Sequence, residues 1–126
     1  MCGIAGVVNF NAKSVELADL RRMTDILEHR GPDGEGHWLN ASANVGLGHR
    51  RLSIIDLSES ASQPMHYAEH RYTISYNGEI YNYLELREQL LQKGYTFRSN
   101  SDTEVLLAIY DWKGKDCLNY LDGMFA

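Results

Sequence analysis

The sequence predicts an α+β fold, and three observations support this class. Short strands come early and in quick succession, helical segments lie between them, and most connections are short. This order favours antiparallel pairing of neighbouring strands.

The first element is an apolar strand at residues 3–8 (GIAGVV). A helix is expected from Ser14, which can act as its N-cap, to about Glu28. Its buried stripe is expected to be Leu17, Leu20, Met23 and Leu27. The next segment, 29–36 (HRGPDGEG), is dense in Gly and Pro and predicts a loop.

The middle of the chain predicts a series of strands rich in β-branched and aromatic residues. They are expected at residues 37–40, 44–48, 51–57 (RLSIIDL) and 71–77 (RYTISYN). The polar segment 58–66 (SESASQPMH) is expected to be a loop.

Two capping boxes mark helices in the last third of the chain. Asn82 and Glu85 begin a helix that ends near Lys93, before Gly94, and residues 95–98 form a short strand. Ser101 and Glu104 begin a second helix.

That second helix is expected to end near Lys113, with a short helix at 115–121. Asp122-Gly123 then predicts a turn, and 124–126 the start of another strand. A strand of three residues at the terminus predicts a fragment of a longer protein, with a frayed end as the alternative.

The composition is that of one globular domain. The chain has 126 residues, of which 44% are hydrophobic and 23% charged. Twelve basic against seventeen acidic residues give a net charge of −5, which disfavours nucleic acid as a partner. The sequence predicts no membrane span and no signal peptide. Two cysteines make no disulfide framework, so a cytoplasmic location is expected.

Cys2 is a candidate nucleophile because it follows the initiator methionine. Removal of Met1 would place a thiol and a free α-amine on one residue. Their reference pKa values, about 8.5 and about 7.7–8.0, let the amine accept the thiol proton near neutral pH. Gly3 would let a substrate approach the backbone closely. The alternative is that Cys2 is a small buried hydrophobe, which is how we interpret Cys117.

Five motifs in order resemble one known family. They are MCGIAGVV at 1–8, HRGPD at 29–33, RLSIIDL at 51–57, NGEIYNY at 77–83 and SDTEVLL at 101–107. Together they resemble the class II glutamine amidotransferase domain over essentially the whole chain. The motifs RLSIIDL and NGEIYNY are most similar to those of the N-terminal glutaminase domain of glutamine-hydrolysing asparagine synthetases.

This resemblance implies an N-terminal nucleophile hydrolase fold, a four-layer αββα sandwich, C-terminally truncated in this chain. Residues 1–126 would then be a glutaminase domain that is incomplete at its C-terminus, with the synthetase domain absent.

The resemblance also implies roles for individual residues. Cys2 matches the nucleophile, and Asn77 with Gly78 matches the oxyanion hole, where each donor is typically worth about 3 kcal/mol. Arg51 matches the residue that holds the substrate α-carboxylate, since a guanidinium offers two parallel donors. Asp102 matches the acceptor of the α-ammonium. Backbone contacts to glutamine are implied for Leu52, Ile54, Ile55 and Glu79.

Each of these residues has a structural alternative. Asn77-Gly78 is also a strong hairpin-turn signal. Arg51 could be a solvated strand residue, and Asp102 could simply favour the helix dipole. His66 and His70 are spaced i, i+4 outside any predicted helix, so no metal site is expected. GLG at 46–48 does not match a nucleotide-binding motif. The HRGPD loop is expected to shape the site.

The predicted function is hydrolysis of glutamine to glutamate and ammonia through a Cys2 thioester, without a cofactor in this domain. The resemblance implies a C-terminal synthetase domain that uses ATP and Mg²⁺ and receives the ammonia, and leaves a homodimer open. Two alternatives remain: a glutaminase domain of another amidotransferase, and a non-catalytic glutamine-binding module.

Overall fold

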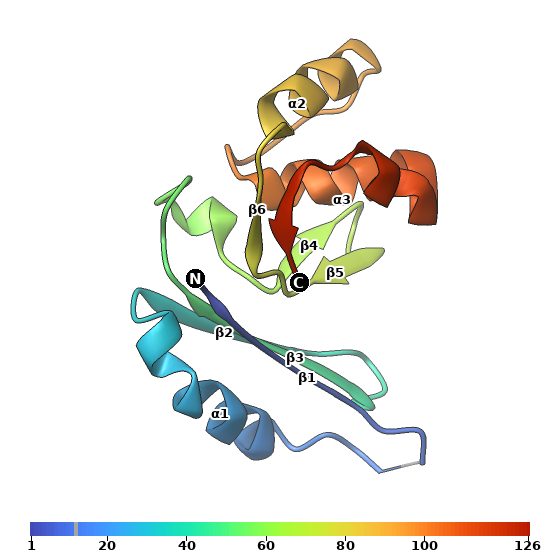
Figure 1. Cartoon of the computed structure of the whole chain (residues 1–126). Helices are drawn as coiled ribbons and strands as arrows, with labels where there is room; N and C mark the ends of the chain where they lie inside the picture. Colours follow the sequence, from blue (N-terminus) through green and yellow to red (C-terminus); the bar gives the residue numbers. More distant parts are fainter. Residues whose placement is uncertain (12) are drawn as a thin grey trace.

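A computed structural model describes residues 1–11 and 13–126 (Figure 1). The strands are β1 (Gly3–Val8), β2 (Gly34–Leu39), β3 (Val45–Arg51), β4 (Met65–Tyr67), β5 (Tyr72–Ile74), β6 (Gly78–Ile80) and β7 (Gly123–Phe125). The α-helices are α1 (Leu17–Ile26), α2 (Tyr83–Gln92) and α3 (Asp102–Lys113). Short 3₁₀ helices span Glu28–Arg30, Glu59–Ala61 and Gly114–Tyr120. This mixture of helices and antiparallel strands confirms the α+β class.

The strands form three antiparallel sheets. The largest has the order β1-β3-β2, in which Gly3 pairs with Arg50 and Gly34 pairs with Arg51. The pairs β4-β5 and β6-β7 form two smaller sheets. In Figure 1, α1 lies against the outer face of the three-stranded sheet, and α3 and α2 lie beyond the small sheets on the opposite side. The strands are therefore enclosed between helices.

Close packing of α1 on β3 depends on two glycines. A Cβ at Gly48 would lie 2.5 Å from Cγ2 of Thr24, and a Cβ at Gly46 would lie 2.9 Å from Val15. Leu20 and Thr24 are fully buried at this contact. A second core lies between α2, α3 and β6, and it is centred on Ile80, Leu90, Val105 and Ile109. Among the described residues, no helix has the length and apolar character needed to cross a bilayer.

The predicted helix 14–28 is shorter than expected. It begins at Leu17 after Glu16, so Ser14 is not its N-cap. Leu20 is buried as predicted, but Leu17 and Met23 are both more than a third exposed, and Thr24 takes the buried position instead. The glycines of β3 leave room only for a small side chain there, which hydrophobicity alone does not reveal.

The strand predicted at 51–57 is wrong after its first residue. β3 ends at Arg51, and Leu52 to Leu57 form an irregular loop. Backbone N–H groups in this loop bond to side chains rather than to a neighbouring strand: Leu52 to the sulfur of Cys2 and Ser53 to Asp33. The strand was predicted because the segment is rich in apolar and β-branched residues. In the structure Leu52 and Ile55 are half-buried without belonging to a sheet.

Other boundaries shift by a few residues. β2 begins inside the predicted loop 29–36, β4 begins inside the predicted loop 58–66, and the strand expected at 71–77 reduces to β5. Residues 95–98 are not a strand. β7 confirms the strand expected at the C-terminus, and it pairs with β6.

The two capping boxes have different outcomes. Ser101 caps α3, since its hydroxyl accepts the N–H of Glu104 at 3.2 Å. The Asn82 side chain instead bonds to Tyr120 and Asp122 at the start of β7. Gly94 ends α2 at a φ of +90°, as a C-terminal glycine should.

Candidate active site

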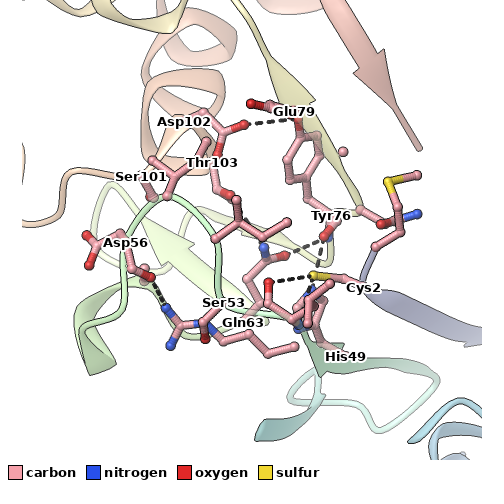
Figure 2. A pocket seen from close by; sticks show the side chains of 18 residues that line it. Cys2, His49, Ser53, Asp56, Gln63, Tyr76, Glu79, Ser101, Asp102 and Thr103 are labelled. Atoms are coloured by element: carbon pink, nitrogen blue, oxygen red, sulfur yellow. Dashed lines mark hydrogen bonds between the residues drawn. The ribbon is translucent and has the colours of Figure 1, made fainter. Parts of the chain in front are cut away.

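One cavity of about 90 Å³ lies where β1, β3, β6 and α3 begin or end (Figure 2). A single water needs roughly 10–15 Å³ of such volume, so the cavity has room for a small ligand. All nine residues singled out from the sequence line it: Cys2, Arg51, Leu52, Ile54, Ile55, Asn77, Gly78, Glu79 and Asp102. The structure thus brings together residues from four separate motifs.

Cys2 lies at the start of β1, half-buried, with its sulfur turned into the cavity (Figure 2). The sulfur accepts the N–H of Leu52 at 3.3 Å and lies 3.6 Å from the carbonyl oxygen of Leu52, to which the thiol can donate. Leu52 immediately follows β3, which pairs with β1, so sheet register fixes this contact. By contrast, Cys117 is buried in the second core, as the sequence predicted.

The HRGPD loop bonds to two residues that line the cavity. Arg30 Nε donates to the carbonyl of Cys2 at 3.2 Å, and Asp33 accepts the N–H of Ser53 at 2.8 Å. Gly31 is required here because a Cβ would lie 2.3 Å from the backbone of Arg50. The loop therefore holds the backbones of Cys2 and Ser53, while none of its own residues is among those that line the cavity.

Arg51 organises the loop that follows β3. Its guanidinium donates to the backbone carbonyls of Ser58, at 2.9 Å, and Asp56. A guanidinium has five N–H donors, so others remain for a ligand. Asp56 in turn accepts the N–H of Asn100 at 2.8 Å and bonds to Ser58. The hydrogen bonds from Ser58 and Asn100 lower the pKa of Asp56.

Asn77 carries a polar atom for which the described residues offer no partner. Its backbone pairs with Ala126 in both directions, but its side-chain Oδ1 is buried without a hydrogen bond. Such an orphaned group is costly unless a ligand satisfies it. A half-turn of the amide would present its NH₂ donor at the same place.

Gly78 begins β6 rather than a hairpin turn. A Cβ there would lie 2.3 Å from the carbonyl oxygen of Met124. Glycine is therefore needed for the close pairing of β6 with β7, whatever its backbone N–H does in the cavity. The hairpin alternative for Asn77-Gly78 is wrong.

Asp102 is a buried carboxylate at the first turn of α3. It is 5% exposed, and its Oδ2 accepts the N–H of Ile80 at 3.0 Å and the hydroxyl of Tyr76 at 3.3 Å. Burial raises the pKa of Asp102, and these two bonds oppose that rise. None of the ion pairs between described residues includes Asp102. A positively charged ligand would supply the missing partner.

Among the other residues that line the cavity are His49, Gln63 and Tyr76, to which the sequence analysis gave no role. His49 Nε2 bonds to the carbonyl of Tyr76 at 3.0 Å, and burial lowers the pKa of His49. Gln63 accepts the N–H of Tyr76 at 2.6 Å. Strand alternation could have placed His49 on the same face as Arg51, but Gln63 has no signal in the sequence.

His66 and His70 lie apart from this cavity in the β4–β5 hairpin. Their rings are 4.4 Å apart, and His66 Nδ1 bonds to Thr73. In the part of the chain that the structure describes, no cluster of three or more His, Cys, Asp or Glu residues could hold a metal ion.

Comparison with known proteins places this site in a family context. A family model described as a glutamine amidotransferase domain matches residues 1–126. "Asparagine synthetase [glutamine-hydrolyzing] 1" of Bacillus subtilis is 48% identical over the whole chain, which spans 20% of that protein. "Asparagine synthetase B [glutamine-hydrolyzing]" of Escherichia coli is 41% identical, with 22% of its length spanned. "Amidase chry2" of Gibberella zeae is 39% identical, with 20% spanned. The chain therefore spans about a fifth of the length of these relatives.

Proposed function

Because the chain belongs to the glutamine amidotransferase domain family, we propose that it hydrolyses glutamine to glutamate and ammonia through a thioester on Cys2. One observation carries the proposal. The sulfur of Cys2 shares a small cavity with the Asn77 amide, whose buried Oδ1 has no partner among the described residues, with a guanidinium at Arg51 and with a buried carboxylate at Asp102. These groups match the nucleophile, oxyanion donor and two charge partners that glutamine hydrolysis needs.

The two charged residues account for recognition of a free amino acid. Remaining N–H donors of Arg51 would hold the α-carboxylate in the two-pronged manner of a guanidinium. Asp102 would accept the α-ammonium, which offsets the cost of its burial. A glutamine within a peptide lacks both charges, so it would bind poorly. Leu52, Ile54, Ile55 and Glu79 would add backbone contacts to the ligand.

The reaction would proceed in two stages. The Cys2 thiol gives its proton to the Cys2 α-amine, and the thiolate sulfur attacks the side-chain amide carbon of glutamine. The amide of Asn77 and the N–H of Gly78 stabilise the resulting oxyanion. The C–N bond then breaks, the α-ammonium returns the proton, and ammonia leaves. Water attacks the thioester, the C–S bond breaks, and glutamate is released with the thiol restored.

This chemistry requires removal of Met1, because an acylated Cys2 nitrogen cannot act as a base. Met1 is more than half exposed and lines the cavity beside Cys2, so it is accessible for removal.

The destination of the ammonia is part of the proposal. Two of the relatives named above are glutamine-hydrolysing asparagine synthetases whose remaining length is about four-fifths of the protein. This supports a synthetase domain of the same chain that uses ATP and Mg²⁺ and receives ammonia to form asparagine. The helix–sheet–sheet–helix order in Figure 1 likewise supports the four-layer αββα sandwich of N-terminal nucleophile hydrolases.

A second candidate is a glutaminase domain that serves another acceptor. A relative named as an amidase has 39% identity to this chain, so the family match alone leaves the acceptor open.

The test compares Cys2→Ala with the unchanged full-length protein. Cys2→Ala should abolish release of glutamate from glutamine while formation of the final amide from added ammonium salt continues. Asparagine as the product of aspartate, ATP and ammonia would support the synthetase assignment, and another amide would favour the second candidate. A Cys2→Ala variant that still releases glutamate would refute the thioester mechanism, and a protein that binds glutamine but never hydrolyses it would be a binding module.

A further inference from the structure

Tyr76 connects the cavity to the carboxylate of Asp102. Its ring is buried, with 4% of the residue exposed, and its hydroxyl donates to Asp102 Oδ2 at 3.3 Å (Figure 2). Burial and the neighbouring Asp102 raise the pKa of the Tyr76 phenol, so the hydroxyl keeps its proton at neutral pH. It is therefore a permanent donor toward the carboxylate.

The backbone of Tyr76 is fixed from two sides. Its N–H donates to Gln63 Oε1 at 2.6 Å, and its carbonyl accepts from His49 Nε2 at 3.0 Å. Gln63 also reaches Thr103 Oγ1 at 3.4 Å, at the first turn of α3. Tyr76 is thus tied both to β3 and to the helix end that carries Asp102.

Two hydrogen bonds to the Asp102 carboxyl end on one oxygen, and the backbone N–H groups of Asp102 and Thr103 also lie close enough to lower its pKa. Oδ2 accepts from the Tyr76 hydroxyl and from the Ile80 N–H at 3.0 Å. Two donors on one oxygen fix the carboxyl group's rotation, and they leave Oδ1 outside these bonds. A carboxylate without them could turn about its χ2 bond, because that torsion is broad.

We propose that Tyr76 is a positioning residue for the amino group of the ligand, acting by holding Asp102 in the orientation that presents Oδ1 to it. This inference rests on the proposed function, since it assumes that Asp102 binds the glutamine ammonium. Tyr76 would not take part in bond making at Cys2. Its effect should therefore appear in KM and in the binding of ligands that carry an amino group.

The experiment uses Tyr76→Phe in the full-length protein, since phenylalanine keeps the buried ring. The matched control is Tyr95→Phe, which removes a similar hydroxyl bond, to Asp111 at 3.1 Å, from a residue outside the cavity lining. Steady-state glutamine hydrolysis gives kcat and KM. Inhibition constants for glutamate and for glutarate compare two ligands that differ only in the amino group.

The expected result for Tyr76→Phe is a rise of about three- to tenfold in the glutamine KM and in the glutamate inhibition constant, the size of one ordinary hydrogen bond. The kcat and the glutarate inhibition constant should stay within about twofold of the unchanged protein. Tyr95→Phe should alter none of these values.

Equal losses for glutamate and glutarate, a fall in kcat alone, or a Tyr76→Phe variant that does not fold would each overturn the positioning role. In all three cases glutamine hydrolysis by the unchanged protein would leave the proposed function intact. Absence of glutamine hydrolysis in the unchanged protein would instead refute the proposed function, and this inference with it.

Discussion

The sulfur of Cys2 accepts a hydrogen bond from the backbone N–H of Leu52 at 3.3 Å, across fifty positions of sequence. The contact joins the residue just before β1 to the first residue after β3. Those strands are neighbours in the sheet, with Gly3 opposite Arg50. The position of the candidate nucleophile is therefore set by strand register rather than by a flexible terminus.

Replacing Asn77 by alanine should slow catalysis without weakening the fold. Loss of one oxyanion donor typically lowers kcat by about 10²–10³, with little change in KM. The side chain has a buried oxygen without a partner among the described residues, so the melting temperature should not fall. Kinetics and thermal unfolding on the same preparation test both statements. A normal kcat, or a large loss of stability, would contradict this role.

Arg51→Lys should weaken glutamine binding although the charge is kept. Lysine cannot reproduce the two-pronged contact, and the bonds that Arg51 makes to the loop carbonyls would also be lost. We expect kcat/KM for glutamine to fall about 10- to 100-fold, mainly through KM.

Arg50→Lys is the matched control, because Arg50 points to the opposite face and pairs with Asp25 and Glu35, which are largely exposed. It should change kcat/KM by less than about threefold. Equal losses in the two variants would show that Arg51 has only a structural role.

Glutamine binding should weaken at low pH because Asp102 becomes protonated. Burial raises the pKa of this carboxyl above its usual value near 3.8. The affinity for the ammonium group should therefore fall as the pH drops through that raised pKa, at a higher pH than for an unperturbed aspartate. Glutamine affinity measured from pH 4 to 8 should show this fall at low pH in the unchanged protein. The Asp102→Asn variant should bind glutamine weakly at every pH. If its affinity still fell at low pH, the titration would belong to another group.

The same shift predicts the sign of the effect on stability. A carboxyl whose pKa is raised on folding contributes stability below its unfolded pKa, and this contribution is lost as the pH rises through the folded pKa. At pH 7, Asp102→Asn should therefore be at least as stable to denaturant as the unchanged protein. A clear loss of stability would show that the carboxylate supports the fold.

His49 should make the fold less stable in acid. Burial lowers the pKa of His49, so the folded state favours its neutral form, although the bond to the Tyr76 carbonyl opposes this shift. Stability is fully present above the unfolded pKa, about 6.5, and is lost as the pH falls below it. His49→Gln keeps a donor at a similar position and should reduce the difference between denaturant midpoints at pH 5 and pH 7.5. The exposed His29, changed to Gln, is the control and should leave that difference unaltered.

The sequence was sufficient to predict which residues line the cavity, but not the backbone structure that carries them. Motifs containing Cys2, Arg51, Asn77 and Asp102 pointed to one cavity, and the structure places all four there. The loop after Arg51 has the composition of a strand, but Leu52 and Ile55 are half-buried at the cavity rather than in a sheet, and Ile54 and Leu57 are exposed. Its hydrogen bonds go to side chains distant in sequence, which local patterns do not encode.

Local rules succeeded where the partners are close in sequence. The Ser101–Glu104 cap and the Gly94 helix end each depend on neighbours within a few residues. The Asn82 cap failed because the side chain found partners nearly forty residues away, at Tyr120 and Asp122. Tyr76 was missed for the same reason, since its hydroxyl partner lies on α3.

The central claim is that Cys2, with a free α-amine, is the nucleophile. The most direct measurement is an intact mass spectrum, with peptide mapping, after incubation with a glutamine-like diazoketone that alkylates the attacking group. The account predicts a protein without Met1 that carries one adduct, on Cys2, and protection of that site by added glutamine. A protein without Met1 that stays unlabelled, or an adduct on Cys117, would contradict it.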